Sequence, residues 1–483
     1  IKPLYISKTP TRLGFASEIK ALKPVLKNLS VDEPCLKAYL NLGYCPEPHT
    51  IYNEIKALEP GCVLEFSASG FRQEKVFEYH FNNRNSQSFE ENLNQVESLI
   101  EASVKRNLIA DVDVAVALSG GIDSSLMYYY ANAAQPGIKG LTVRFDDEAY
   151  DESGLASQYA KAVNGAQEII DLENDFDLEV LNKILLNFDQ PYADSSAIPV
   201  YYLTKATSQY SKVLVGGDGG DELFNGYPSQ TWLHKMMRLK SNRLAGITGK
   251  AIFGMGRAVL GGHRKRLLNR LNTLWNDQPE DMLYDWHSWF PRSTTFQGRS
   301  AFTFTDLEGI ELYKQLFTHE LPEEYDGQVL FDYFRKTMLS DYLRKTDMMS
   351  MFNGVEYRVP LLDEDLVSFA FTIPFEQKSA LKKTKIFLRK IHEKSYPPET
   401  SRARKKGFTI PLDKSLSESD FAEMQALMLD KKDGLVTQYV KPEYVSFLFK
   451  SLKSRSDAEI SRASVYQRIL MLYSLELWND RNL

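Results

Sequence analysis

The sequence predicts an α/β fold built on a parallel sheet, because short apolar segments alternate with helical segments along its middle part. The apolar segments lie at residues 112–117, 141–145 and 213–215, and a glycine-rich or acidic loop follows each of them. Helical patterns follow the first two loops, from 126 to about 134 and from about 152 to 163. Strands and helices in this alternation form a parallel sheet that is covered on both faces. Ligands of such sheets bind at the carboxyl ends of the strands, where we expect all three loops.

The composition is that of a globular protein with two or three domains. The chain has 483 residues, of which 43% are hydrophobic and 25% charged. A net charge of −6 without a basic stripe argues against nucleic-acid binding. No uncharged stretch reaches the roughly 18 residues of a membrane span, and no secretory segment opens the chain. Cys35, Cys45 and Cys62 lack a paired spacing, so we expect buried packing cysteines in a cytoplasmic protein.

Patterns along the chain divide it into two parts. Residues 1–80 carry short β patterns separated by turn residues, and a polar linker follows at 82–91. Apolar residues at helical spacing predict a helix from 92 to 107. Residues 230–330 and the C-terminal third are largely helical in pattern, and the amphipathic segment 464–478 is expected to be core. We therefore expect one domain over 1–80 and a second over 81–483.

The loop after the first strand has the features of a phosphate-binding loop. Residues 118–125 read Leu-Ser-Gly-Gly-Ile-Asp-Ser-Ser, and at such a strand-to-helix turn the backbone N–H groups and the helix dipole face one point. Two glycines would let a phosphate approach the backbone, and three serines add hydroxyl donors. These residues are Gly120, Gly121, Ser119, Ser124 and Ser125. The loop is not a Walker A motif, since no Gly-Lys-Ser/Thr closes it; the alternative is an ordinary glycine turn.

The loop after the third strand combines acidic residues with glycines. Asp218, Asp221 and Glu222 lie among four glycines at 216–220, and glycine is kept where a chain must approach something closely. A dinucleotide fingerprint fails here, because Glu222 stands where the third glycine is needed. Mg²⁺ takes one or two carboxylates together with phosphates, so this loop, with Asp123 from the first, predicts a magnesium site. An acidic turn at a strand end is the alternative.

Over nearly its whole length the chain resembles the asparagine synthetase (glutamine-hydrolysing) family. The matching stretches are 1–5, 15–22, 118–125, 150–153, 189–199, 216–227, 345–351, 356–363 and 405–408. The resemblance implies an ATP pyrophosphatase-like (adenine nucleotide α-hydrolase-like) synthetase domain with a helical C-terminal part. The β-rich end of an N-terminal-nucleophile glutaminase domain would precede it, within residues 1–80.

The resemblance also implies a chemistry. ATP would adenylate a carboxylate, most simply that of aspartate, and ammonia would displace AMP to leave an amide and pyrophosphate. Lys405 matches the family's catalytic lysine, although beside Arg404 and Lys406 it could belong to a surface cluster. Asp218 matches an acidic position suited to taking a proton from ammonia, and Asp123 and Asp221 would hold Mg²⁺. Positions that line the family's adenosine pocket are matched by Leu118, Val143, Gly216 and Gly217.

Three further matches carry no assigned role. Asp194 and Asp363 lie in family motifs, and Arg358 could be either a carboxylate clamp or a structural residue. The expected partners are small-molecule substrates, namely a carboxylate and ammonia or glutamine. Whether the chain also forms a homodimer is a question that the sequence leaves open.

The chain departs from the family pattern in ways that keep alternatives open. The family's glutaminase domain begins with a catalytic cysteine, whereas the chain begins at Ile1 and its three cysteines are internal. We therefore expect either a truncated sequence or a loss of glutamine hydrolysis. Residues 165–168 lack a usual histidine pair, and Ala403 replaces a common arginine. Amidation of another carboxylate such as a sugar acid, a non-catalytic nucleotide-binding module and a structural partner protein are the other readings.

Overall fold

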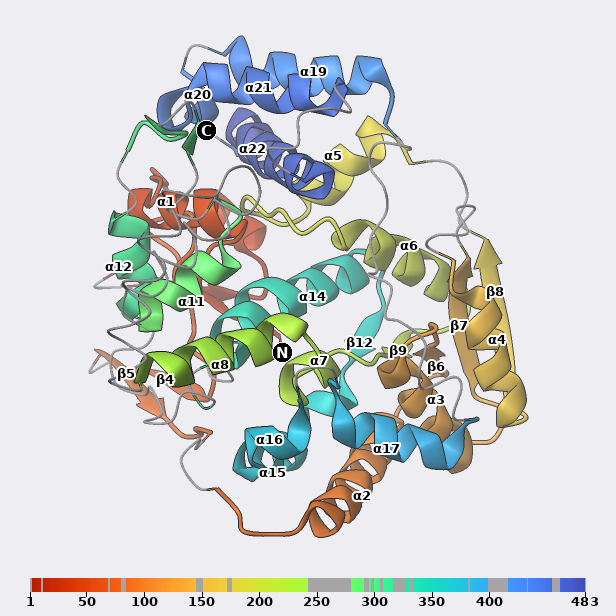
Figure 1. Ribbon diagram of the computed structural model, residues 1–483. Coiled ribbons are helices and arrows are strands. Elements are labelled where there is room, and N and C mark those ends of the chain that lie inside the picture. Colours follow the sequence, from red (N-terminus) through yellow and green to blue (C-terminus); the bar gives the residue numbers. More distant parts are fainter. Residues whose placement is uncertain are drawn as a thin grey trace, which may run out of the picture.

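Figure 1 shows the fold in a computed structural model of the chain. The structure describes residues 2–9, 12–67, 70–79, 84–144, 151–171, 176–241, 279–290, 295–296, 299–304, 307–315, 327, 329, 333–380, 383–397, 416–431, 433–453 and 461–482.

A five-stranded parallel sheet forms the centre of the larger part of the molecule, as the sequence predicts. Its order is β12 (Glu356–Arg358), β9 (Val213–Val215), β6 (Val114–Ala117), β7 (Lys139–Arg144) and β8 (Ala166–Asp171). The three predicted strands are β6, β7 and β9. The chain builds β6, β7 and β8 outward in one direction and then returns to add β9 and β12 on the other side of β6. This change of direction places a topological switch point between β6 and β9.

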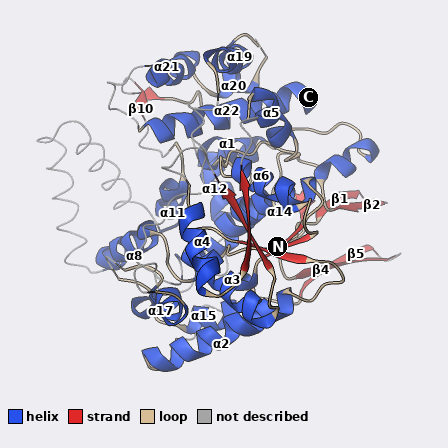
Figure 2. Ribbon diagram, turned by 90° about the vertical axis from the view of Figure 1, so that its right-hand side faces the viewer, coloured by secondary structure: helices blue, strands red, loops and turns tan. Residues whose placement is uncertain are grey.

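Helices cover the sheet and join its strands. The crossover from β6 to β7 is α3 (Ile122–Ala134), the next is α4 (Ser153–Ala162), and α5 (Leu178–Leu186) and α6 (Ala197–Thr207) precede β9. Figure 2 shows the sheet enclosed by helices. Strand β6 is buried along Val114–Val116 because neither of its faces meets water.

A second group of helices packs below the sheet in Figure 1. It contains α2 (Phe89–Asn107), α15 (Glu364–Thr372), α16 (Phe375–Lys378) and α17 (Ile386–Ser395). A capping box fixes the start of α2, since Ser88 and Glu91 each accept a hydrogen bond from the other's backbone N–H. The apolar faces of α2, α15 and α17 join the core of the sheet.

The described residues of the N-terminal part, from 2 to 79, form a smaller, mainly antiparallel unit. Strands β2 (Arg12–Ala16), β1 (Tyr5–Thr9) and β3 (Lys56–Ala57) make one sheet, and β4 (Cys62–Ser67) pairs with β5 (Gly70–Lys75) in a hairpin. The chain between β2 and β3 contains α1 (Glu33–Leu42), whose first turn is capped by the Asp32 carboxylate and which ends at Gly43 with φ of 86°. Cys35 and Cys45 are buried as expected, whereas Cys62 is only partly buried.

The C-terminal helices share a core with α1. They are α19 (Glu418–Leu429), α20 (Leu435–Tyr439), α21 (Pro442–Lys453) and α22 (Arg462–Asn482). Helix α22 is buried over most of its length, which confirms that segment 464–478 is core; it is not amphipathic as expected, because its polar residues are buried along with its apolar ones. The Tyr39 hydroxyl donates to the Met471 carbonyl at 2.7 Å, so the N-terminal and C-terminal ends of the chain pack into one apolar cluster.

Shorter elements connect these groups. They are η1 (Ile19–Ala21), η2 (Lys23–Val25), α7 (Gly220–Leu223), α8 (Pro228–Ser241), α11 (Pro279–His287), β10 (Thr295–Phe296), β11 (Arg299–Ser300), α12 (Leu307–Gln315), the π-helix η3 (Tyr333–Tyr342), α14 (Leu343–Phe352) and η4 (Pro360–Leu362). The described parts of 230–330 are thus mainly helical, as predicted. No helix among the described residues has the length and apolar character needed to cross a membrane.

Candidate active site

The loops that follow β6 and β9 meet at the carboxyl edge of the sheet. A Cβ atom on Gly217 would lie 2.8 Å from the Ser124 nitrogen, and one on Gly220 would lie 2.7 Å from Cγ of Asp123. Only glycine therefore allows the two loops to come this close. The loop after β7, with Asp146, Asp147 and Glu148, falls outside the described residues.

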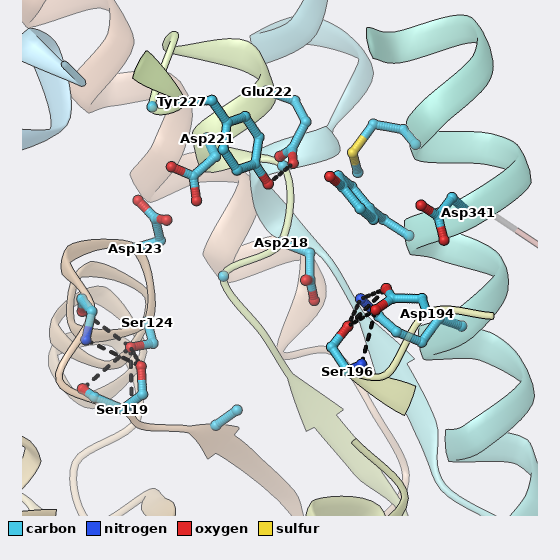
Figure 3. A pocket seen from close by; sticks show the side chains of 18 of the residues that line it. Ser119, Asp123, Ser124, Asp194, Ser196, Asp218, Asp221, Glu222, Tyr227 and Asp341 are labelled. Atoms are coloured by element: carbon cyan, nitrogen blue, oxygen red, sulfur yellow. Dashed lines mark hydrogen bonds and ion pairs between the residues drawn. The ribbon is translucent and has the colours of Figure 1, made fainter. Parts of the chain in front are cut away.

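A cavity of about 570 Å³ opens between these loops. Its size is typical of a small-molecule site. Figure 3 shows that the carboxylates of Asp123, Asp218 and Asp221 come from the two loops, while Asp194 and Asp341 lie on the opposite side. Residues 42–44, at the end of α1, also line the cavity. The site is therefore built from both parts of the chain.

The first loop is ordered by its own serines. The Ser119 N–H donates to Ser124 Oγ at 3.1 Å, and the Gly121 N–H donates to Ser119 Oγ at 3.1 Å. Helix α3 begins without a side-chain cap, so the positive end of its dipole faces the cavity. The Gly120 N–H donates to Oε2 of Glu152 at 3.1 Å. A carboxylate thus already accepts from a backbone donor suited to a phosphate oxygen.

Two of the acidic residues share one buried cation. Lys385, immediately before α17, places its Nζ 2.8 Å from Oδ1 of Asp221 and also contacts Oδ2 of Asp123. Burial alone would lower the pKa of Lys385, but the two carboxylates hold that pKa above its usual value. Asp123 and Asp221 therefore form a pair that attracts positive charge.

The same pair fits Mg²⁺ in the presence of a nucleotide. No group of three or more His, Cys, Asp or Glu within the described ranges could hold a metal ion unaided. Two carboxylates are, however, what Mg²⁺ takes from a protein when phosphates and water supply its other ligands. Asp123 and Asp221 would hold the ion, and Lys385 would then be free to turn to a phosphate.

Glu222 lies beside this pair with a perturbed acidity. Burial, and then the charge of Asp221, raise the pKa of Glu222 to about 7. Its Oε1 accepts a 2.7 Å hydrogen bond from the Tyr227 hydroxyl.

The opposite side of the cavity holds a second cluster. Lys345 Nζ lies 2.9 Å from Oδ2 of Asp194 and 2.7 Å from the Ser196 hydroxyl. Asp341 accepts a 2.6 Å hydrogen bond from Tyr192, and burial, followed by the charge of Asp194, raises the pKa of Asp341 to about 7. Asp218 lies between this cluster and the phosphate loop (Figure 3).

Comparison with known proteins agrees with this geometry. Residues 95–480 match the asparagine synthase family, and residues 1–78 match a glutamine amidotransferase domain. The chain belongs to the asparagine synthase family. It carries a partial glutamine amidotransferase domain at its N-terminus. The fold and family expected from the sequence are thus confirmed.

Relatives of this family match at moderate identity. The chain is 30% identical over 416 residues to asparagine synthetase [glutamine-hydrolyzing] 1 of Bacillus subtilis. The aligned region covers 85% of the chain and 64% of that relative. A putative asparagine synthetase of Mycobacterium bovis is 27% identical over 438 residues, with the same coverage of 85% and 64%. Amidase chyE of Penicillium rubens is 25% identical over 417 residues, covering 77% of the chain and 60% of the relative. The chain therefore spans less than two thirds of the length of these relatives.

The structure brings most of the predicted site residues of this asparagine synthase-family chain to one cavity. Ten of them line it: Leu118, Ser119, Gly120, Gly121, Asp123, Ser124, Val143, Gly217, Asp218 and Asp221. Ser125 is not among the lining residues; it is fully buried, and its hydroxyl donates to the Ile122 carbonyl at 2.8 Å. Gly216 is also absent from the lining, and a Cβ there would lie 1.9 Å from the Tyr357 hydroxyl oxygen. Lys405 falls outside the described residues.

Two motif residues left open by the sequence have structural contacts. Arg358 donates to the carbonyls of Asn107 and Ile109, both at 2.8 Å, and does not line the cavity. Asp363 caps α15 and pairs with Arg106 at 2.6 Å. Both residues therefore join α2 and the segment that follows it to the β12–α15 segment. The hypothesis that Arg358 binds a substrate carboxylate has no geometric support.

Sequence reasoning missed several residues of the cavity. Glu152 and Lys345 lie in matching family stretches, but the sequence assigned neither of them a role. Glu222 was predicted only as one of three acidic residues in its loop, with no role of its own. Lys385 and Arg389 lie in a stretch with several lysines and arginines that resembles a solvated surface. Only their position before and within α17, facing the phosphate loop, distinguishes these two from ordinary surface cations.

Proposed function

We propose that this chain catalyses ATP-dependent amidation of a carboxylate through an acyl-adenylate, with aspartate as the first candidate acceptor and asparagine as its product. The observation that carries the proposal is one cavity in which a serine–glycine loop, a carboxylate pair and a separate Lys345–Asp194 cluster surround Asp218. This arrangement has a phosphate side and an acceptor side, and the reacting atoms would meet between them.

On the phosphate side, the triphosphate would lie over the first turn of α3. Its oxygens would accept hydrogen bonds from the hydroxyls of Ser119 and Ser124 and from the N–H groups at the start of α3. The Gly120 N–H would then donate to a phosphate oxygen in place of the Glu152 carboxylate. Mg²⁺ held by Asp123 and Asp221 would supply charge neutralisation to the pyrophosphate. Leu118 and Val143 would contact the adenosine, with Gly217 close by.

The chemical step exchanges one bond for another. A carboxylate oxygen of the acceptor would bond to the α-phosphorus, and the bond from that phosphorus to the bridging oxygen of the β-phosphate would break. Pyrophosphate leaves, and Lys385 and Arg389 lie where they can bind its charge. Lys405 is proposed to neutralise the charge that develops at the α-phosphate.

Ammonia would then attack the acyl carbon and displace AMP. The nitrogen must lose a proton as the amide forms, and the carboxylate of Asp218 is proposed to accept it. In a complete protein with a glutaminase domain the nitrogen would come from glutamine. A sugar acid or another carboxylate stays as an alternative acceptor, since the relative from Penicillium rubens is called an amidase and not an asparagine synthetase.

The test is to identify the nucleotide product. The chain is incubated with ATP, Mg²⁺, ammonium chloride and L-aspartate, or D-glucuronate as a second acceptor, and the nucleotides are separated by chromatography. AMP and pyrophosphate in equal amounts, dependent on the carboxylate, are expected. ADP as the sole product would exclude the acyl-adenylate. Asp221→Asn should abolish most of the AMP formation, whereas Asp171→Asn, which changes only an exposed ion pair with Arg144, serves as the matched control.

A further inference from the structure

Acidic side chains outnumber basic ones in the cavity. Seven carboxylates line it among the described residues: Asp123, Glu152, Asp194, Asp218, Asp221, Glu222 and Asp341. The described lining cations are Lys345, Lys385 and Arg389. Bringing an anionic acceptor into this cavity, next to a triphosphate, would be opposed by like charges unless a cation receives it.

The three cations are not distributed evenly. Lys385 and Arg389 belong to the segment that begins α17, and Lys385 is taken up by Asp123 and Asp221 on the phosphate side. Lys345 is the third residue of α14 and lies with Asp194 and Ser196. Within the part of the cavity lining that the structure describes, it is the one cation on the acceptor side.

Lys345 is held in place with a donor to spare. An ammonium group has three N–H donors. One donates to Oδ2 of Asp194 at 2.9 Å and another to Oγ of Ser196 at 2.7 Å. Asp194 is itself fixed, because its Oδ1 accepts from the Ser196 N–H at 2.8 Å. The Nζ also lies 5.1 Å from the centroid of the Tyr342 ring, but no oxygen of a described residue accepts its third N–H, and the side chain is only 11% exposed.

The charge of Lys345 is secure despite its burial. Burial would lower its pKa, but the carboxylates of Asp194, Asp341 and Asp218 together raise that pKa above its usual value. The ammonium is therefore protonated at neutral pH, and the charge of the nearby Asp218 contributes to this.

We propose that Lys345 binds the reacting carboxylate of the acceptor, and that Asp194 and Ser196 are the residues that position its ammonium. This assignment rests on the proposed function and deepens it, since it names the group that receives the acceptor. The bound carboxylate lies beside Asp218, with the phosphate loop on its other side. The acceptor is therefore an anion at this position, and a neutral amide or ester is not bound there.

The rival explanation is that Lys345 only neutralises the buried carboxylate of Asp194. Lys345→Met alone cannot separate the two, because it leaves Asp194 buried without its cation, and such a loss destabilises a fold. The double variant Asp194→Asn/Lys345→Met removes both charges at nearly constant shape. If the lysine were merely structural, this variant would recover the wild-type kinetics. Lys56→Met is the matched control, because Lys56 also lies 2.9 Å from a carboxylate, that of Asp32, but does not line the cavity.

The readout is carboxylate-dependent exchange of labelled pyrophosphate into ATP, with L-aspartate and then D-glucuronate as the acceptor, because it needs no nitrogen source. Binding of a non-hydrolysable ATP analogue with Mg²⁺ and the melting temperature are measured on the same samples. We expect both Lys345 variants to raise the KM for the carboxylate by roughly 10- to 100-fold, the usual effect of one charged hydrogen bond. Affinity for the analogue should stay within about threefold of wild type, because Lys345 faces the acceptor and not the triphosphate.

Two results would count against the assignment, and they differ. A double variant with the wild-type KM would overturn the role of Lys345 while leaving the proposed function intact. A wild-type protein that shows no exchange with either acceptor, although it binds the analogue, would refute the proposed function for these two acceptors and the assignment with it. A raised KM in the double variant at an unchanged melting temperature supports both.

Discussion

Replacing Lys385 by methionine tests whether Asp123 and Asp221 form a cation site. The side chain of Lys385 is 8% exposed and those of Asp123 and Asp221 are 16% and 11% exposed. Removal of one partner from a buried ion pair costs about 3–5 kcal/mol, because the remaining charge is left uncompensated. We therefore expect Lys385→Met to lower the free energy of unfolding by that amount in a chelating buffer.

Magnesium should reverse much of this loss. With the ammonium gone, the two carboxylates are left facing each other, and a divalent cation can replace its charge. An ion that binds only the folded state at 100 times its Kd contributes about 2.7 kcal/mol. Melting curves of the variant should therefore move to higher temperature on addition of millimolar MgCl₂, whereas the wild type should respond weakly without nucleotide.

The control lies on α17, which Lys385 directly precedes. Lys390 pairs with Glu393 at 3.0 Å on the exposed face of α17, and exposed pairs contribute about 0–1 kcal/mol. Lys390→Met should therefore leave both the stability and the magnesium response unchanged. If Lys385→Met were as stable as wild type and indifferent to Mg²⁺, the ammonium would not bridge the two carboxylates, and the proposed metal pair would lose its support.

Three further outcomes are expected. Lys405→Ala should lower kcat by roughly 10²–10³, with a much smaller change in ATP affinity, because its charge is needed mainly in the transition state; unchanged turnover in a steady-state assay would return Lys405 to a surface role. His392 is buried between the rings of Tyr159 and Tyr396, and burial lowers its pKa from 6.5 to about 4, so the unfolded chain takes up the proton first as the pH falls. The contribution of neutral His392 to the free energy of unfolding is fully present above about pH 6.5, and roughly 3 kcal/mol of it is lost by pH 4. His392→Phe should therefore make the melting temperature depend less on pH over this range. An identical acid dependence in the variant would show that His392 is not the group responsible. A protein of residues 1–483 should use ammonium chloride and not glutamine, because Cys35, Cys45 and Cys62 are internal and cannot use their own amino groups as a base; glutamate release that matches product formation would disprove this.

The predictable part of the fold followed from local periodicity. Strands β6, β7 and β9 are short apolar segments with a loop of distinct composition behind them, and their neighbours α3 and α4 were expected within a few residues of their observed starts. Strand β8 was missed because Ala166–Asp171 reads Ala-Gln-Glu-Ile-Ile-Asp, which neither alternates strictly nor forms a continuous apolar run, at the edge of the sheet. Strand β12 was missed because three residues, Glu356–Arg358, carry no periodicity at all. The boundary between residues 80 and 81 stays a prediction.

The sequence by itself determined the α/β class and the two loops that make the phosphate side, because each loop is a contiguous motif whose backbone and side chains act together. Tertiary structure alone decided the rest of the site. Lys385 lies 262 residues from Asp123 and Lys345 lies 151 residues from Asp194, and no local pattern records which distant side chains meet. The tertiary structure also decided that the Ser125 hydroxyl donates a hydrogen bond to the Ile122 carbonyl within α3, whereas Ser119 and Ser124 line the cavity. The physical reason is that strand order and helix packing, and not neighbourhood in the chain, choose which charges share a buried volume.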